Sequence, residues 1–311
     1  MNKQILIRQA FNEQYSLLIE MDSLLINSVM KSKTEMRYDF TIKSIDEDTF
    51  ECRLVQLDIF IHETNNNLIN EVAEVTGAFN RMFNELHLKM SHGGEVLEIL
   101  NSALIYSKWK QTKILMRNAS SKNPDLEKLI SLSDSLFTDP QKIIMAVQAN
   151  EFIQVYFGDV FNTEIPGVKH EQNRTNLFNT VNLPWKISLD SNTEVSADIN
   201  LIEVTSSSIP AVQLDAGFKK IAYKTFEDQL DVVKLVPVLT EESKYLIDFS
   251  SGRVLEAEVI KKEVAEMKQL FTTMKYSLKG DRLKHKPEIV ETNGQDSTVK
   301  TDQSRFKFFT I

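Results

Sequence analysis

The side chains of this chain that could do chemistry are few. The sequence holds five histidines and a single cysteine. His87 and His92 are the nearest pair of histidines, and their odd spacing along a strand would turn them to opposite faces, which does not suit a metal site. Cys52 lies in the strand-like run TFECRLVQLDIFI without a histidine partner motif, which favours a small buried residue over a nucleophile. We therefore predict no metal ligands and no catalytic residues.

A pair of carboxylates offers another route to chemistry. Glu256 and Glu258 share one face if residues 253–259 are extended, and paired carboxylates can act as acid and base when burial raises one pKa. The alternate residues are apolar and form the opposite face, so we predict that both glutamates face water. The sequence contains no phosphate-binding glycine loop and no nucleophile elbow. These observations favour a protein that is not an enzyme and has no cofactor. An active site built from scattered residues stays an alternative.

The composition is that of a folded chain and not of a general nucleic-acid binder. Hydrophobic residues make up 42% and charged residues 26% of the sequence, while the formal net charge is −8. One cysteine cannot form an intramolecular disulfide, and no run reaches the roughly 18 apolar residues of a membrane span. The first apolar run, residues 5–7, is too short for a secretion signal. We predict a cytoplasmic protein.

Alternation of apolar and polar residues predicts long strands in the first part of the chain. In TEMRYDFTIKSI, Met36, Tyr38 and Phe40 fall on one face and charged residues fall on the other, which is the pattern of a half-buried strand. FECRLVQLDIFIH follows as another strand, with Leu54 predicted on the face opposite to Ile59. The connections are too short for crossover helices, so the strands should form an antiparallel meander.

The middle of the chain has a helical pattern. Asn123 and Asp139 each precede a proline, and these pairs match an N-cap followed by the first helical residue. Residues 158–182 contain glycine, proline and many polar residues, and we predict a connecting loop. Strand patterns resume at Leu183 and extend through AVQLDAGFKKIAYKTF to KYLIDFS.

Two short stretches suggest that one architectural unit occurs twice. HLKMSHGGEVLEIL, residues 87–100, and YLIDFSSGRVLEAEV, residues 245–259, both carry a leucine, then six positions later the motif Gly-x-Val-Leu-Glu. Glycine permits a positive φ in the turn between two strands. Duplication and the general likeness of strand–turn–strand elements are both open explanations.

These patterns predict an α+β fold with long antiparallel β meanders in two similar halves, a helical section between them and a flexible tail. The predicted units are a first β-rich half at 1–102, a helical section at 103–157, a connecting loop at 158–182, a second β-rich half at 183–280, and a flexible tail with an aromatic end at 281–311.

The end of the chain is the predicted partner-binding segment. Residues 281–304 are polar and should form a tether, whereas the last residues are rich in phenylalanine. The predicted partner-binding residues are Arg305, Phe306, Lys307, Phe308, Phe309 and Ile311. Their alternation suits strand addition to a sheet edge, and the alternative is a solvated end without function. If the segment docks, its deletion should change thermal stability or the recovery of partners in a pull-down.

The sequence therefore favours a non-enzymatic cytoplasmic binding or structural module. It would engage protein partners, or a second copy of itself, through sheet edges and the RFKFFTI segment. The alternative is a carrier of an apolar small ligand in a cavity between sheet and helices. The identity of partner or ligand and the oligomeric state do not follow from the sequence.

Overall fold

The computed structural model describes residues 3–65, 81–120, 124–192 and 200–281. Within these residues the dominant element is one antiparallel sheet of 11 strands, in the order β6-β5-β4-β3-β2-β13-β12-β11-β10-β9-β8. The strands are β2 (Phe11–Leu25), β3 (Ser28–Ile45), β4 (Thr49–Thr64), β5 (Glu85–Ser91), β6 (Val96–Ile99), β8 (Gly167–Thr175), β9 (Asn182–Asn192), β10 (Leu201–Pro210), β11 (Val238–Asp248), β12 (Arg253–Glu266) and β13 (Leu270–Gly280). The short strands β1 (Lys3–Gln4) and β7 (Glu164–Ile165) form a separate pair.

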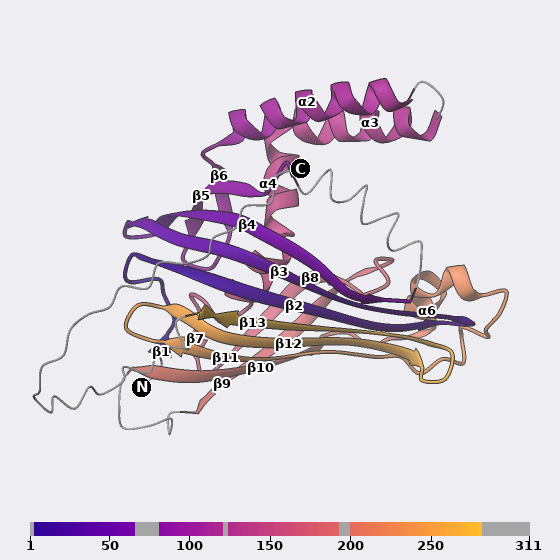
Figure 1. Cartoon of the computed structure of the whole chain (residues 1–311). Helices are drawn as coiled ribbons and strands as arrows, with labels where there is room; N and C mark the ends of the chain where they lie inside the picture. Colours follow the sequence, from indigo (N-terminus) through magenta and orange to yellow (C-terminus); the bar gives the residue numbers. More distant parts are fainter. Residues whose placement is uncertain (1–2, 66–80, 121–123, 193–199, 282–311) are drawn as a thin grey trace, which may run out of the picture.

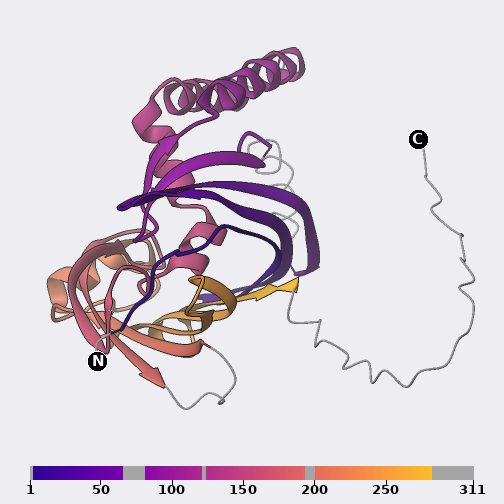
Figure 2. The ribbon, with the colours of Figure 1, turned by 90° about the vertical axis from the view of Figure 1, so that its left-hand side faces the viewer.

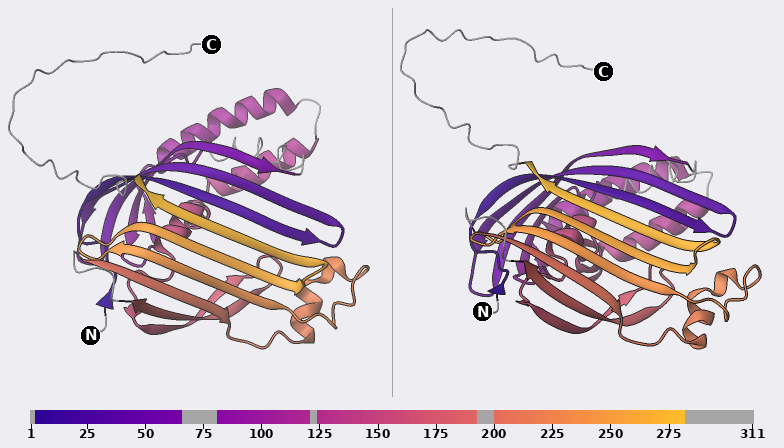
Figure 3. Two further views of the ribbon diagram at one scale, coloured as in Figure 1. Left: turned by 60° about the horizontal axis from the view of Figure 1, so that its bottom comes forward. Right: turned by 90° about the horizontal axis from the view of Figure 1, so that it is seen from below.

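The sheet consists of two meanders that meet in its middle. Strands β2 to β6 follow one another in space as they do in sequence, and so do β8 to β13. The first long strand then pairs with the last, as β2 joins β13 along its length from Tyr15 opposite Gly280 to Leu25 opposite Leu270. Figure 3 shows these two strands side by side in one continuous surface. The predicted antiparallel meanders are confirmed, and the two predicted halves form a single sheet.

The helical section connects the far ends of the two meanders. It comprises α2 (Ser102–Ser120), α3 (Pro124–Phe137), α4 (Pro140–Gln148) and α5 (Glu151–Phe157). Helices α2 and α3 lie together above the sheet, and α4 leads back toward it (Figure 1). Asp139 caps α4 as predicted, because its side chain accepts hydrogen bonds from the first helical amides. The sequence pattern showed no break before α5, where Asn150 caps a new helix in the same way.

Two stretches differ from the sequence prediction. The predicted loop at 158–182 contains β7 and β8, and β8 lies at an edge of the sheet. An edge strand is bonded on one side only, and β8 also has a register shift between Lys169 and Gln172, so its sequence lacks clean alternation. The stretch AVQLDAGFKKIAYKTF was predicted as strand, but it contains α6 (Ala216–Ala222) and a 3-10 turn, η1 (Lys224–Phe226). Asp215 starts α6, since its side chain accepts a hydrogen bond from the Phe218 amide.

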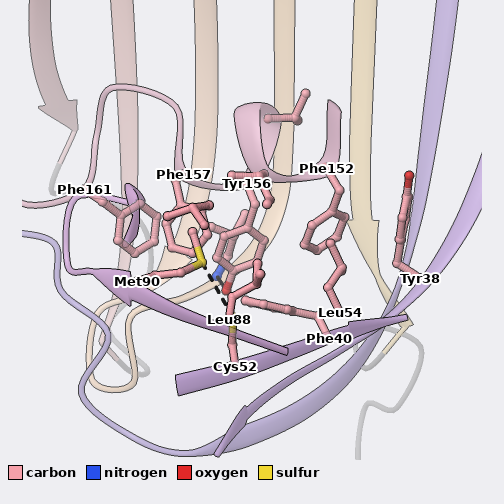
Figure 4. Packing of buried hydrophobic residues seen from close by; sticks show 14 of the residues in the cluster. Tyr38, Phe40, Cys52, Leu54, Leu88, Met90, Phe152, Tyr156, Phe157 and Phe161 are labelled. Atoms are coloured by element: carbon pink, nitrogen blue, oxygen red, sulfur yellow. Dashed lines mark hydrogen bonds between the residues drawn. The ribbon is translucent and has the colours of Figure 1, made fainter. Parts of the chain in front are cut away.

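The core forms where the curved sheet wraps around α5 (Figure 2). Phe152 of α5 packs edge-on against Tyr15 of β2 and Phe40 of β3, with ring centroids 5.5 Å and 5.3 Å away. Tyr156 also stacks in this group, and its hydroxyl accepts a hydrogen bond from the Val254 amide at 3.2 Å. Figure 4 shows Phe40, Phe152 and Tyr156 among the aromatic rings that fill the space between helix and strands. The face beneath α5 is therefore packed with protein side chains.

Both stretches that suggested an internal repeat form two strands joined by a turn in the same sheet. Gly94 and Gly252 occupy the corresponding turns with φ of 86° and 75°, values that only glycine adopts without strain. A side chain on Gly94 would overlap Phe157, and one on Gly252 would overlap the Leu6 carbonyl. The turn hydrogen bonds differ, since Gly94 bonds back to Ser91 and Gly252 to Asp248. Duplication stays a prediction.

Candidate ligand-binding face of the sheet

A run of apolar side chains lies on the concave face beyond α5. We call it the apolar strip; it consists of Ile19, Met21, Met36, Ile59, Ile61, Met274 and Tyr276. Strand pairing places Ile19 opposite Tyr276 and Met21 opposite Met274. Because directly opposed residues of antiparallel strands share a face, the strip is continuous across β13 and β2. On β3, Met36 lies opposite Ile59 of β4, and Thr34 separates Ile19 of β2 from Ile61 of β4.

The strip shares its face with the aromatic core. Tyr15 contacts α5, and alternate residues of a strand share a face, so Leu17, Ile19 and Met21 point to the same side. On β4 this relation is altered by a register shift, because Gln56 faces Tyr38 and Asp58 faces Arg37, which leaves Leu57 as an extra residue. As a result Leu54 and Ile59 lie on the same face. The prediction that they lie on opposite faces is wrong.

Coverage by α5 ends where the strip begins. Tyr15, Leu17 and Tyr38 are at most 2% exposed, whereas Ile59 and Ile61 are 48% and 41% exposed. The other side chains of the strip are half-buried, and Ile19, Met36 and Tyr276 pack against the rim of the core. In Figure 1 the long strands β2 to β4 run on past α4 toward α6. Partly exposed apolar surface on a concave face is a candidate binding surface.

Charged residues adjoin the strip on the same face. We call Asp159, Arg174, Glu241 and Lys261 the polar cluster. Lys261 of β12 is paired with Met274 of the strip on β13 and with Glu241 on β11. The Glu241 carboxylate lies 3.3 Å from both the Arg174 guanidinium and the Lys261 ammonium, while Asp159 holds the other end of Arg174. The Lys261 ammonium is also 6.0 Å from the centroid of the Tyr276 ring. Apolar and charged surfaces thus meet along one strand boundary.

Two cavities open at the polar cluster. One has a volume of about 160 Å³ and is lined by Arg174, Glu241 and Lys261 together with Trp185 of β9 and Gln154 of α5. The second has a volume of about 390 Å³ and shares four of these residues, all except Trp185. Burial acts to lower the pKa of Arg174, but attraction to Asp159 and Glu241 outweighs it and the pKa is raised. Arg174 therefore carries its charge into this partly enclosed space.

Glu263 is a buried carboxyl group beside the smaller cavity. It accepts hydrogen bonds from the Asn176 side chain at 2.9 Å, the Leu177 amide at 2.7 Å and the Tyr223 hydroxyl at 3.0 Å. Its exposure is 0%, and desolvation by burial raises its pKa although these hydrogen bonds act in the opposite direction. These hydrogen bonds attach the loop that follows β8 to strand β12. They also hold Glu263 in place beside the cavity.

The described histidines and Cys52 do not form a common site. His87 contacts Glu85 at 3.2 Å, and His92 approaches the Asp46 carbonyl at 3.4 Å. Among the described residues, no group of histidine, cysteine and carboxylate side chains is arranged to hold a metal ion. Cys52 is buried against Met90, as predicted, and burial raises the pKa of its thiol (Figure 4).

Other predicted residues have separate places. Glu258 is exposed and pairs with Lys275 at 2.7 Å, which confirms the solvated face expected for it. The tail, including Arg305 to Ile311, lies outside the described residues. No helix in the described ranges has the length and apolarity that crossing a bilayer would require.

Sequence reasoning missed the polar cluster although part of its signal is visible. Leu255, Ala257 and Val259 form an apolar face, and continuing the same alternation places Lys261 and Glu263 inside. Charged residues at inward positions of a strand are a recognisable exception to the pattern. Arg174, by contrast, lies in the stretch predicted as a loop, so its position on the sheet could not be anticipated.

Comparisons with known proteins include a weak structural likeness. No protein-family model and no curated protein sequence matches the chain. A solved structure concerned with lipid–protein interactions in lipovitellin aligns with a TM-score of 0.39 and 9% sequence identity, covering 94% of this chain and 26% of that chain. The chain thus spans about a quarter of the length of that protein chain. A likeness with so low a TM-score supports no conclusion about ligands.

Proposed function

We propose that the protein binds an amphiphile with a long apolar chain along the apolar strip. The observation that carries this proposal is the partial exposure of Ile59 and Ile61 on the concave face that also carries the half-buried Met21 and Met274. Ile61 is in register with Ile19 through Thr34 of β3. Covering such surface with a hydrocarbon chain is favourable by about 25 cal/mol per Å² of apolar area removed from water. The strip runs across neighbouring strands, which suits an elongated chain better than a compact ring.

The chemistry of the strip supports an adaptable binding surface. Met21, Met36 and Met274 have unbranched, flexible side chains that fit partners of varying shape. Aromatic rings pack the space directly beneath α5, so the ligand belongs beyond the helix and not between helix and sheet. The proposal therefore keeps the apolar-ligand alternative of the sequence analysis and moves its location.

A charge placed in the strip tests the proposal. The Ile61→Glu substitution puts a carboxylate on the binding face and removes apolar surface that the ligand chain would cover. The affinity for a fluorescent fatty-chain probe should fall at least tenfold, which corresponds to a loss of about 1.4 kcal/mol in binding free energy. Phe60→Glu is the matched control, since Phe60 is adjacent, 49% exposed and on the opposite face. Equal loss in both variants, or no binding of the probe to the unmodified protein, would refute the proposal.

Partner binding through sheet edges has less support from the described residues. The edge strands of the sheet are β6, which has four residues and whose Val96 amide donates to Gln148 of α4, and β8, which is bulged and polar. Short and bulged edges resist the addition of another strand. Partner binding by the tail stays a prediction.

A further inference from the structure

We infer that the polar cluster and the adjoining cavity bind the anionic oxygen head group of the amphiphile, which makes the ligand class a single-chain acid. The inference rests on the proposed function, since the head group is placed relative to a chain on the apolar strip. It adds a binding site with Trp185, Arg174 and Lys261 as its donors.

Trp185 supplies the observation that points to a ligand. Its side chain is 6% exposed, and its indole nitrogen has no hydrogen-bond acceptor among the described residues. An indole N–H can only donate, and a buried donor without an acceptor is costly. Trp185 lines the cavity of about 160 Å³ together with Arg174 and Lys261. A ligand oxygen in this cavity within hydrogen-bond distance of the indole nitrogen would supply an acceptor.

The two cations keep N–H groups for a further acceptor, although Nη2 of Arg174 already donates to Asp159 and to Gln172. Both cations share the same oxygen of Glu241, each at 3.3 Å, whereas hydrogen bonds between charged groups are usually about 2.7–2.9 Å. Their side chains are 22% and 27% exposed, so they are open to a solute as well as partly desolvated. Arginine and lysine present only donors. The donors Trp185, Arg174 and Lys261 suit an acceptor-only group such as a carboxylate or phosphate, which would lie beside the Glu241 and Glu263 carboxyl groups that line the same cavity.

The position of Lys261 connects this wall to the strip. Lys261 is directly opposite Met274, which is in turn opposite Met21. Neighbouring strands lie about 4.8 Å apart, so the cationic side chain is one strand away from the apolar surface. A head group at Lys261 would leave its chain at the start of the strip. The alternative role of the polar cluster is to join β8, β11 and β12 without a ligand.

The test compares ligands that differ only in their head group. Palmitate, hexadecyl phosphate and the neutral hexadecanol are titrated by displacement of a neutral fatty-chain probe. The unmodified protein should bind at least one of the acids at least tenfold more tightly than the alcohol. The acid that binds more tightly shows whether the site prefers a carboxylate or a phosphate head group. In Lys261→Met that preference should disappear, while Lys261→Arg should retain it.

Controls separate this inference from the proposed function. Lys275→Met removes a cation from the same strand region on the opposite face and should leave the preference unchanged. Trp185→Phe keeps an aromatic ring, although a smaller one, and removes the N–H donor, so it should lower the preference at least threefold. Equal binding of acids and alcohol by the unmodified protein would overturn the head-group site and leave the strip intact. Failure of all three ligands to displace the probe would overturn the proposed function as well.

Discussion

The charged side chains on the concave face of the second meander differ in how deeply they are buried. Lys261 and Arg174 share Glu241 and are partly exposed, whereas Glu263 is buried and accepts three hydrogen bonds. Burial raises the pKa of Glu263, so protonation of this carboxyl is easier in the folded than in the unfolded chain. The preference of folded Glu263 for the protonated form therefore stabilises the fold. This stabilisation is complete below the unfolded pKa of about 4.3 and is lost as pH rises through the raised folded pKa.

Removing the tyrosine donor to Glu263 should therefore have a pH-dependent cost. Tyr223→Phe deletes the hydroxyl that donates to the carboxyl at 3.0 Å. We expect the free energy of unfolding to fall by about 0.5–1.5 kcal/mol at pH 4, where the carboxyl is protonated, and by about 1.5–3 kcal/mol at an alkaline pH above its raised pKa, where it is charged. Urea unfolding at both pH values measures the difference. Tyr106→Phe, at an exposed tyrosine, should change neither value, and a loss in Tyr223→Phe that is equal at both pH values would contradict the account.

At the scale of elements, turns and bulges decide which faces meet. The Gly94 turn between β5 and β6 lies against Phe157 at the end of α5. The register shift at Leu57 brings Ile59 and Ile61 onto the same face as the core. The Gly94 turn and the bulge at Leu57 are each set by the backbone of one residue. The turn determines the contact with α5, and the bulge determines which side chains of β4 face the core side.

An alanine at Gly94 tests this contact between turn and helix. Gly94→Ala forces a left-handed conformation, which costs about 1–2 kcal/mol, and drives a methyl group into Phe157, which adds about 1–3 kcal/mol. We expect the free energy of unfolding to fall by about 2–5 kcal/mol in urea denaturation. Gly93→Ala is the control, because an added carbon there meets nothing closer than 3.6 Å. The same loss at both glycines would show that the Phe157 contact is unimportant.

The elements were predictable where pattern and cap coincide. Alternation in TEMRYDFTIKSI located β3, and Asp139 with Pro140 located the start of α4. The predicted secondary structure was wrong where it depends on the position of a strand within the sheet or on a single capping residue. β8 is polar because it lies at the edge of the sheet, and α6 depends on the Asp215 cap within a stretch that reads as strand. The apolar strip was missed for the same reason, because strict alternation along β4 ignores the bulge.

At the scale of the whole molecule, the chain builds one curved sheet from both ends and covers part of its concave face with α5. The remaining part of that face is apolar toward β4 and β2 and charged toward β11 and β8. An amphiphile has the same division between chain and head group. The docking role predicted for Arg305 to Ile311 lies outside the described residues, and deletion of that segment remains its test.

The most direct measurement of ligand binding on this face is photo-crosslinking with a C16 fatty acid that carries a diazirine in its chain. After irradiation and digestion, mass spectrometry locates the modified peptides. The account predicts labels on the strip-bearing stretches, residues 17–23 of β2, 57–63 of β4 and 272–276 of β13, and competition by unlabelled palmitate should remove them. Labels confined to α2 and α3 or to the convex face, or labels that palmitate does not displace, would contradict an amphiphile on the apolar strip.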